Sequence, residues 1–129
     1  MSDPAPIEIK LRTKSRVLEV VFDNGERFEL PFEYLRVYSP SAEVRGHGPG
    51  QETLQLGKHE VGIKAVEPVG HYAVRLVFDD GHDTGLYSWS YLHELGRTRA
   101  EKWQRYLDRL AKLGLPYPTP VPKGRARPA

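Results

Sequence analysis

The strongest constraint on the fold is a segment that occurs twice. VFDDGHDTGLYSWSYL spans residues 77–92, and a degenerate copy, VFDNGERFELPFEYL, spans residues 21–35. In each copy an apolar run ends in Asp-x-Gly, and Asn and Gly tolerate the positive φ that a tight hairpin turn requires. Each copy therefore predicts two antiparallel strands and then an aromatic-led helical turn. Two copies are too few for a solenoid, but they can pack as a pseudo-symmetric pair of hairpins.

Further strands and a short helix follow from alternation and turn chemistry. Ile7, Ile9 and Leu11 alternate with charged residues, which is typical of a strand with one buried face. The predicted strands span residues 7–11, 18–22, 28–31, 61–69, 72–78 and 84–87, and a helical turn spans 32–35. Residues 39–51 are predicted to form a loop, because they are rich in glycine and proline. Ser88 is expected to cap a short helix that ends at Gly96.

The C-terminal third has clear helical periodicity. Thr98 and Glu101 have the spacing of a capping box, in which two backbone amides are satisfied reciprocally. The apolar face of the predicted helix consists of Trp103, Tyr106, Leu107, Leu110 and Leu113. Gly114 stands where the helix should end. The expected fold class is therefore α+β, with short antiparallel strands in two hairpins, short helical turns and one C-terminal amphipathic helix.

The length of 129 residues fits a single domain, predicted over residues 7–114. Residues 1–6 and the proline-rich basic tail at 115–129 are expected to be disordered. The chain has no cysteine, which excludes disulfides, thiolate catalysis and cysteine-ligated metal or iron–sulfur sites. No signal-like segment and no run of about 18 apolar residues is present, so no membrane association is predicted and the expected location is the cytoplasm.

Charge is distributed unevenly along the chain. Residues 97–129 contain nine Lys and Arg against two acids, a net charge of +7, and residues 1–96 therefore carry −5. This asymmetry indicates either an anionic partner or a solvated helix face with a solubilising tail. Nucleic acid is not the expected partner, because the aromatic residues of the helix share its apolar face and few are left to stack on bases.

Two longer motifs resemble a known family. LRVYSPSAEVRGHGPGQ and YAVRLVFDDGHDTGLYSWSYLHELG are similar to the gamma-butyrobetaine hydroxylase-like N-terminal domain family, and the resemblance covers roughly residues 7–97. The family consists largely of small bacterial proteins of unknown function. The same domain precedes the oxygenase domain of gamma-butyrobetaine and trimethyllysine hydroxylases, and a related domain follows the P-loop ATPase of plastid iron–sulfur scaffold proteins.

The resemblance implies a relic of a metal site. The hydroxylase domains bind a structural zinc through a Cys-x-Cys-x-x-Cys cluster and a distant histidine, and these positions fall on Ser39, Ser41, Val44 and His82. Three of the four ligands are replaced, so no metal is predicted. Without zinc, the serines are expected to bond neighbouring backbone groups and Val44 to turn inward. His82 is expected to be a neutral turn residue, replaceable by Asn at a cost of about 1 kcal/mol or less.

The residues indicate a binding module rather than an enzyme. No nucleophile–base pattern or cofactor loop is evident, and too few residues follow the family-like region to form an oxygenase domain. The glycine-rich loop suggests Arg45, His47 and Gln51 as binding residues. We therefore expect a non-enzymatic accessory module with a protein partner and no cofactor, an adaptor linked to iron–sulfur or oxygenase systems.

Two alternatives remain open. In the first, iron or zinc is bound by histidines and aspartates, and His47, His82 and either Asp79 or Asp83 are the residues that could assemble such a site. In the second, the basic C-terminal segment binds an anionic or nucleic-acid partner, which would make binding strongly dependent on salt.

Overall fold

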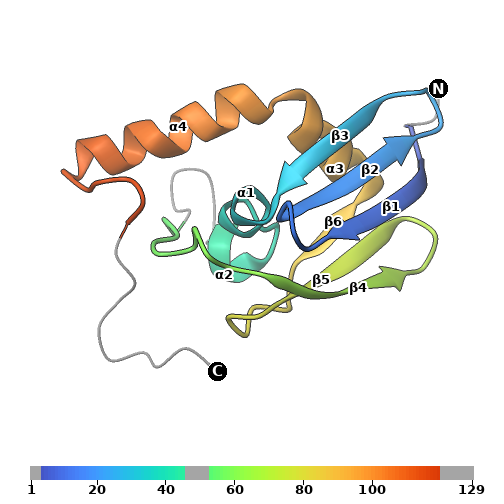
Figure 1. Cartoon of the computed structure of the whole chain (residues 1–129), viewed down its shortest axis with the longest axis horizontal. Helices are drawn as coiled ribbons and strands as arrows, with labels where there is room; N and C mark the ends of the chain where they lie inside the picture. Colours follow the sequence, from blue (N-terminus) through green and yellow to red (C-terminus); the bar gives the residue numbers. More distant parts are fainter. Residues whose placement is uncertain (1–3, 46–52, 120–129) are drawn as a thin grey trace.

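The computed structural model describes residues 4–45 and 53–119, and its fold is α+β as predicted (Figure 1). Two three-stranded antiparallel sheets, with strand orders β1-β2-β3 and β4-β5-β6, are each followed by helices. The first half consists of β1 (Pro6–Arg12), β2 (Val17–Phe22), β3 (Arg27–Pro31), α1 (Phe32–Val37) and α2 (Ala42–Arg45). The second half consists of β4 (Ile63–Val69), β5 (Ala73–Phe78), β6 (Leu86–Ser88), α3 (Trp89–Arg97) and α4 (Arg99–Lys112). Within the described residues, no helix has the length and apolar character needed to cross a membrane.

The two predicted hairpin turns have the same conformation. Gly25 and Gly81 have φ values of +89° and +91°. The side chain before each glycine bonds the amide two residues later. Asn24 Oδ1 accepts from Glu26 N at 3.0 Å, and Asp80 Oδ1 accepts from His82 N at 3.1 Å. The repeated sequence thus encodes the same turn twice, which confirms the prediction made from the Asp-x-Gly pattern.

The halves are also joined by reciprocal contacts between helices and turns. Arg36 on α1 donates to Asp80 in the second turn at 2.9 Å, and His93 on α3 lies 2.6 Å from Glu26 in the first turn. Each of these side chains comes from one copy of the repeat and contacts the turn of the other copy. The two copies of the repeat are therefore related by pseudo-symmetric contacts within the chain.

Two tyrosines repeat this exchange in the core. The hydroxyl of Tyr34 on α1 donates to the Leu95 carbonyl of α3 at 2.7 Å, and the hydroxyl of Tyr91 on α3 donates to the Tyr38 carbonyl after α1. One hydrophobic core lies between the two sheets and the helices α1 and α3. Its largest fully buried members include Leu18, Phe22, Leu30, Leu35, Leu76, Phe78, Tyr87, Leu92 and Leu95. Because the core is shared, the two halves form one domain.

The passage from α3 to α4 differs from the prediction. Ser88 caps α3 as expected, accepting from Tyr91 N at 3.1 Å. Gly96 does not end the helix, which continues to Arg97. The predicted capping box is wrong, because the Thr98 side chain makes no cap hydrogen bond and donates instead to the Glu94 carbonyl at 2.7 Å. One residue joins the two helices, so the orphan amides of α4 are not capped in the usual way.

The amphipathic helix α4 lies along one side of the molecule (Figure 1). Tyr106 and Leu110 are buried against Val37 in a second apolar cluster, whereas Leu113, predicted to be apolar-face core, is 64% exposed. Gly114 has the expected positive φ of +69°.

The predicted start of the tail at residue 115 is too early. Leu115 N donates to the Leu110 carbonyl, and the Tyr117 hydroxyl donates to Glu33. Thr119 is 2% exposed and accepts a hydrogen bond from Gly57 N. Residues 115–119 therefore pack on the domain, and the rest of the predicted tail lies outside the described residues.

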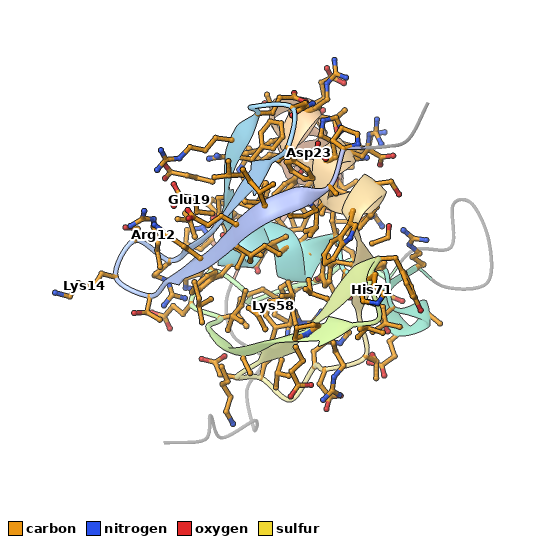
Figure 2. All side chains as sticks on the ribbon, turned by 90° about the vertical axis from the view of Figure 1, so that its right-hand side faces the viewer. Arg12, Lys14, Glu19, Asp23, Lys58 and His71 are labelled. Atoms are coloured by element: carbon orange, nitrogen blue, oxygen red, sulfur yellow. The ribbon has the colours of Figure 1, made fainter. Side chains whose placement is uncertain are left out.

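The outer face of the first sheet is polar. Figure 2 shows Arg12 and Glu19 together on this face, with Lys14 projecting from the turn between β1 and β2. Arg12 donates to Glu19 at 2.7 Å, and Arg27 pairs with the other oxygen of the same carboxylate. The two guanidinium groups lower the pKa of Glu19, chiefly through the Arg12 hydrogen bond. Arginines on β1 and β3 thus neutralise the carboxylate of Glu19 on β2.

Candidate functional site

The positions to which the resemblance assigned the zinc ligands of the hydroxylase domains lie at one corner of the fold. Ser39 follows α1, and His82 follows the turn after β5. Their side chains are hydrogen-bonded, with 2.7 Å between Ser39 Oγ and His82 Nε2. Ser39 is 1% exposed and His82 is 6% exposed. The expectation that His82 lies outside the core is therefore wrong.

Hydrogen bonds and packing close the rest of this corner. Ser39 Oγ accepts from Ser41 N at 3.3 Å, and Ser41 Oγ accepts from Glu43 N at 3.2 Å. The Ser41 hydroxyl also lies 2.7 Å from the hydroxyl of Thr84. Val44 is 5% exposed. The serines bond neighbouring backbone amides and the valine turns inward, as expected. We call this group, Ser39, Ser41, Glu43, Val44, His82 and Thr84, the Ser39–His82 corner.

The donor set of this corner does not fit a structural zinc. Such a site takes four nitrogen, sulfur or carboxylate donors. Here the matching positions offer one imidazole, two hydroxyls and a valine. Glu43 Oε2 lies 3.4 Å from His82 Nδ1, which brings one carboxylate to the corner. Across the described residues, no three His, Asp or Glu side chains are grouped to hold a metal ion.

The corner has the order of a Ser–His–carboxylate relay, which sequence reasoning missed because the three residues are distant in the chain. Ser39 faces His82 Nε2, and Glu43 faces His82 Nδ1. A nucleophilic serine must reach its substrate. The hydroxyl of Ser39 is buried and also accepts the Ser41 amide, so this arrangement fits a structural hydrogen-bond network rather than acyl transfer.

Charged groups beside the corner set its electrostatics. Asp80 accepts from Arg36 at 2.9 Å and from Lys58 at 2.7 Å. Burial would raise the pKa of Asp80, but the Lys58 and Arg36 contacts and the His82 amide together lower it to about 2. Burial, followed by the charge of Arg36, lowers the pKa of His82, while Glu43 and Asp80 act in the opposite direction. The imidazole is therefore held in its neutral form.

Replacing His82 by Asn is expected to lower the free energy of unfolding by about 1–3 kcal/mol, because the buried Ser39 hydroxyl loses its partner. The cost should shrink in acid. Below the ordinary pKa of 6.5 the unfolded chain takes up a proton that the folded chain resists, so wild-type stability falls as pH drops through 6.5. Urea unfolding of both proteins at pH 5 and pH 8 measures this. A cost well below 1 kcal/mol at pH 8 would contradict it.

Asp80 is expected to make the protein less stable in strong acid. Its folded pKa of about 2 lies below the ordinary 3.8, so the stabilisation is complete above pH 3.8 and is lost as pH falls towards 2. The shift corresponds to about 2 kcal/mol. Unfolding of wild type and Asp80→Asn between pH 5 and pH 2 should give curves that converge in acid. In a Lys58→Met background, Asp80→Asn should cost less free energy of unfolding. Parallel curves, in which the cost of Asp80→Asn does not change with pH, would show that Asp80 is not the titrating group.

The prediction of a loop at residues 39–51 is wrong over Ala42–Arg45, which form α2, and this range is described only as far as Arg45. Arg45, the last residue of α2, lies with its guanidinium carbon 5.0 Å from the ring centroid of Tyr91. His47 and Gln51 fall outside the described residues. The alternative metal site that includes His47 therefore lies partly outside the described residues.

A separate groove of about 810 Å³ lies beside α4. Its lining includes Glu33, Tyr34, Arg97, Arg99, Trp103 and Tyr117. Tyr117 packs edge-on against Trp103 and bonds Glu33, so part of the wall of the groove is formed by the chain's own C-terminal segment. None of the lining residues belongs to the Ser39–His82 corner, and the lining carries both charge signs.

Comparisons place these features in a family context. The profile described as "Gamma-butyrobetaine hydroxylase-like, N-terminal" matches residues 9–93. Two proteins with solution NMR structures are similar, at 42% and 47% identity, each with a TM-score of 0.78; the alignments cover 97% and 99% of this chain and 98% and 96% of those chains. A crystal structure of a protein of unknown function of the DUF971 family, from Acidithiobacillus ferrooxidans, is 43% identical with a TM-score of 0.62 over 74% of this chain and 98% of that one. No curated protein matches.

Proposed function

Because the chain belongs to the gamma-butyrobetaine hydroxylase-like N-terminal family, we propose that it acts as a non-enzymatic accessory module that binds a protein partner. In this proposal the protein works in the cytoplasm as an adaptor for an iron–sulfur or oxygenase system. The link to those systems rests on the fusions in which related domains occur, which is an argument by analogy.

The observation that carries the proposal is the closed state of the Ser39–His82 corner. A catalytic or metal centre needs side chains that are open to a substrate or can complete a ligand set. Here Ser39 and His82 are buried and bonded to each other, and Val44 is buried as well. The site that most resembles a catalytic or metal centre is thus closed by structural contacts. This favours a protein that binds its partner through its surface.

The protein is expected to contain no stoichiometric zinc or iron, and its thermal midpoint is expected to be unchanged by chelators. A structural zinc contributes roughly 10–16 kcal/mol only with its complete ligand set. Elemental analysis of untagged protein, with melting of wild type and His82→Asn with and without a chelator, measures this. One equivalent of metal that is lost in His82→Asn would restore the metal-binding alternative.

The adaptor role is tested by cross-linking in the native cytosol. Protein tagged and expressed at its natural level is captured after cross-linking, and each candidate partner is then reconstituted from purified components. Stoichiometric binding to an iron–sulfur assembly protein or an oxygenase subunit supports the proposal. If purified candidates fail to bind, or if the protein turns over a substrate by itself, the proposal is overturned.

A further inference from the structure

A patterned basic surface lies on α4. Lys102, Arg105, Arg109 and Lys112 follow one another at spacings of three, four and three residues, which places them along one side of a helix. We call these four residues the basic face. Tyr106 and Leu110 point instead into the apolar cluster below the helix. The acid Asp108 lies three residues after Arg105 and four before Lys112, at the edge of the basic face, and accepts a hydrogen bond from the Gln104 amide at 2.9 Å.

The first residue of the predicted binding loop, Arg45, is linked to this face through two tyrosines. The Lys102 ammonium lies 5.7 Å from the ring centroid of Tyr38, and Arg45 lies over the neighbouring ring of Tyr91. The two tyrosines are joined, because Tyr91 donates its hydroxyl to the Tyr38 carbonyl. Arg45 and Lys102 therefore each contact one of two hydrogen-bonded tyrosines, although they are far apart in the sequence.

Two more cations of the basic face lie near the same ring. Burial raises the pKa of Tyr38, and the positive charges of Arg105 and Arg109 act against that rise. An acid also lies here, since Glu94 Oε2 is 3.3 Å from Lys102 Nζ. Only 17% of the Lys102 side chain is exposed, whereas Glu94 is 55% exposed, so it is the Glu94 side of this pair that faces solvent.

We infer that the basic face, together with Arg45, is a docking surface for an acidic segment of a partner protein. This inference rests on the proposed function and specifies the chemistry of its partner. From Lys102 to Lys112 the helix rises about 15 Å. An extended segment of about five residues covers that length, so alternate carboxylates along it can meet successive cations.

The surroundings favour an acidic protein segment over nucleic acid. Trp103 and Tyr106 pack beneath α4, and the rings of Tyr38 and Tyr91 are already covered by Lys102 and Arg45. Few rings are left to stack on bases, which contributes much of the affinity for single strands. Residues 1–96 carry a net charge of −5, which opposes a long polyanion more than a short acidic segment.

The test is fluorescence anisotropy of the full chain with three labelled probes of equal length: a ten-residue peptide of alternating Glu and Ser, the same peptide with Gln for Glu, and single-stranded DNA. The expected result is binding of the acidic peptide that weakens steeply with salt, and little binding of the Gln peptide. Arg105→Glu with Arg109→Glu should weaken binding of the acidic peptide at least tenfold, and Arg45→Glu should weaken it severalfold.

The matched control is Lys14→Glu with Lys64→Glu. Lys14 is exposed in the turn between β1 and β2, Lys64 is exposed on β4, and their reversal changes the net charge by the same amount. The control should bind the acidic peptide within about twofold of wild type. Equal loss in both double variants would show that net charge alone is responsible and would overturn the inference. DNA that binds more tightly than the peptide, with the same sensitivity to Arg105 and Arg109, would also overturn it.

The partner captured by cross-linking separates this inference from the proposed function. Loss of that partner in the Arg105→Glu, Arg109→Glu variant, with an unchanged melting temperature, supports the inference. A partner that this variant retains would overturn the basic face as the docking surface while leaving the adaptor role intact. Anisotropy still decides the inference if no partner is captured.

Discussion

Replacing Trp103 by Ala is expected to lower the free energy of unfolding by about 3 kcal/mol, the lower end of the range for large aromatic truncations, because the indole is only partly buried. The ring joins α4 to the rest of the protein. Its centroid lies 5.0 Å from that of Tyr106, 5.6 Å from that of Tyr117 and 6.4 Å from that of Tyr34. Truncation therefore removes contacts to α1 and to the C-terminal segment at the same time.

Urea unfolding followed by circular dichroism measures this loss. The control is Leu113→Ala in the residue that follows α4, whose side chain is 64% exposed and should change stability by less than about 0.5 kcal/mol. An unfolding midpoint that Trp103→Ala leaves unchanged would mean that α4 is not docked. In that case the contact of Lys102 with the Tyr38 ring would also be lost.

Replacing Gly96 by Ala is expected to destabilise the protein by about 1–3 kcal/mol. This is opposite in sign to the usual effect, since Ala is normally better than Gly inside a helix by about 1 kcal/mol. A Cβ at Gly96 would lie 2.4 Å from Cγ of Phe28. The Phe28 ring cannot easily move away, because it packs edge-on between Phe22 and His93.

A double-mutant cycle with Phe28→Ala tests the cause. Gly96→Ala should be destabilising in the wild-type background and neutral or stabilising when Phe28 is Ala, because the obstructing ring is gone. Stabilisation by Gly96→Ala in the wild-type background would show that α3 does not approach β3 as closely as described.

Local sequence chemistry predicted the elements well, for a physical reason. Turns and caps depend on a few neighbouring residues, so Gly25, Gly81 and Ser88 were assigned correctly from their own surroundings. The errors occur where contacts from elsewhere in the fold override local preference. Gly96 reads as a helix stop, but its role is to let Phe28 approach. Thr98 reads as a cap, but its hydroxyl bonds the preceding helix because one residue joins α3 to α4.

The candidate site shows the same contrast between what local sequence predicts and what long-range contacts decide. The family resemblance placed Ser39 and His82 in one site by analogy, but composition and spacing do not show that their side chains bond each other or that Glu43 completes the row. In the sequence, Arg45 and the basic C-terminal helix are two separate features that no pattern connects. Their approach across Tyr38 and Tyr91 depends on how α3 and α4 pack, which no local pattern encodes.

By itself, the sequence determined the repeated turns, the alternating strands, the amphipathic helix and the absence of cysteine chemistry, because each of these depends on residue type and short-range spacing. Only the tertiary structure decided that the two copies exchange contacts, that the Ser39–His82 corner is closed, and that Arg45 is linked to Lys102 through Tyr91 and Tyr38. These features join side chains tens of residues apart. Their proximity follows from burying one shared core between two sheets, and that burial is a property of the whole chain.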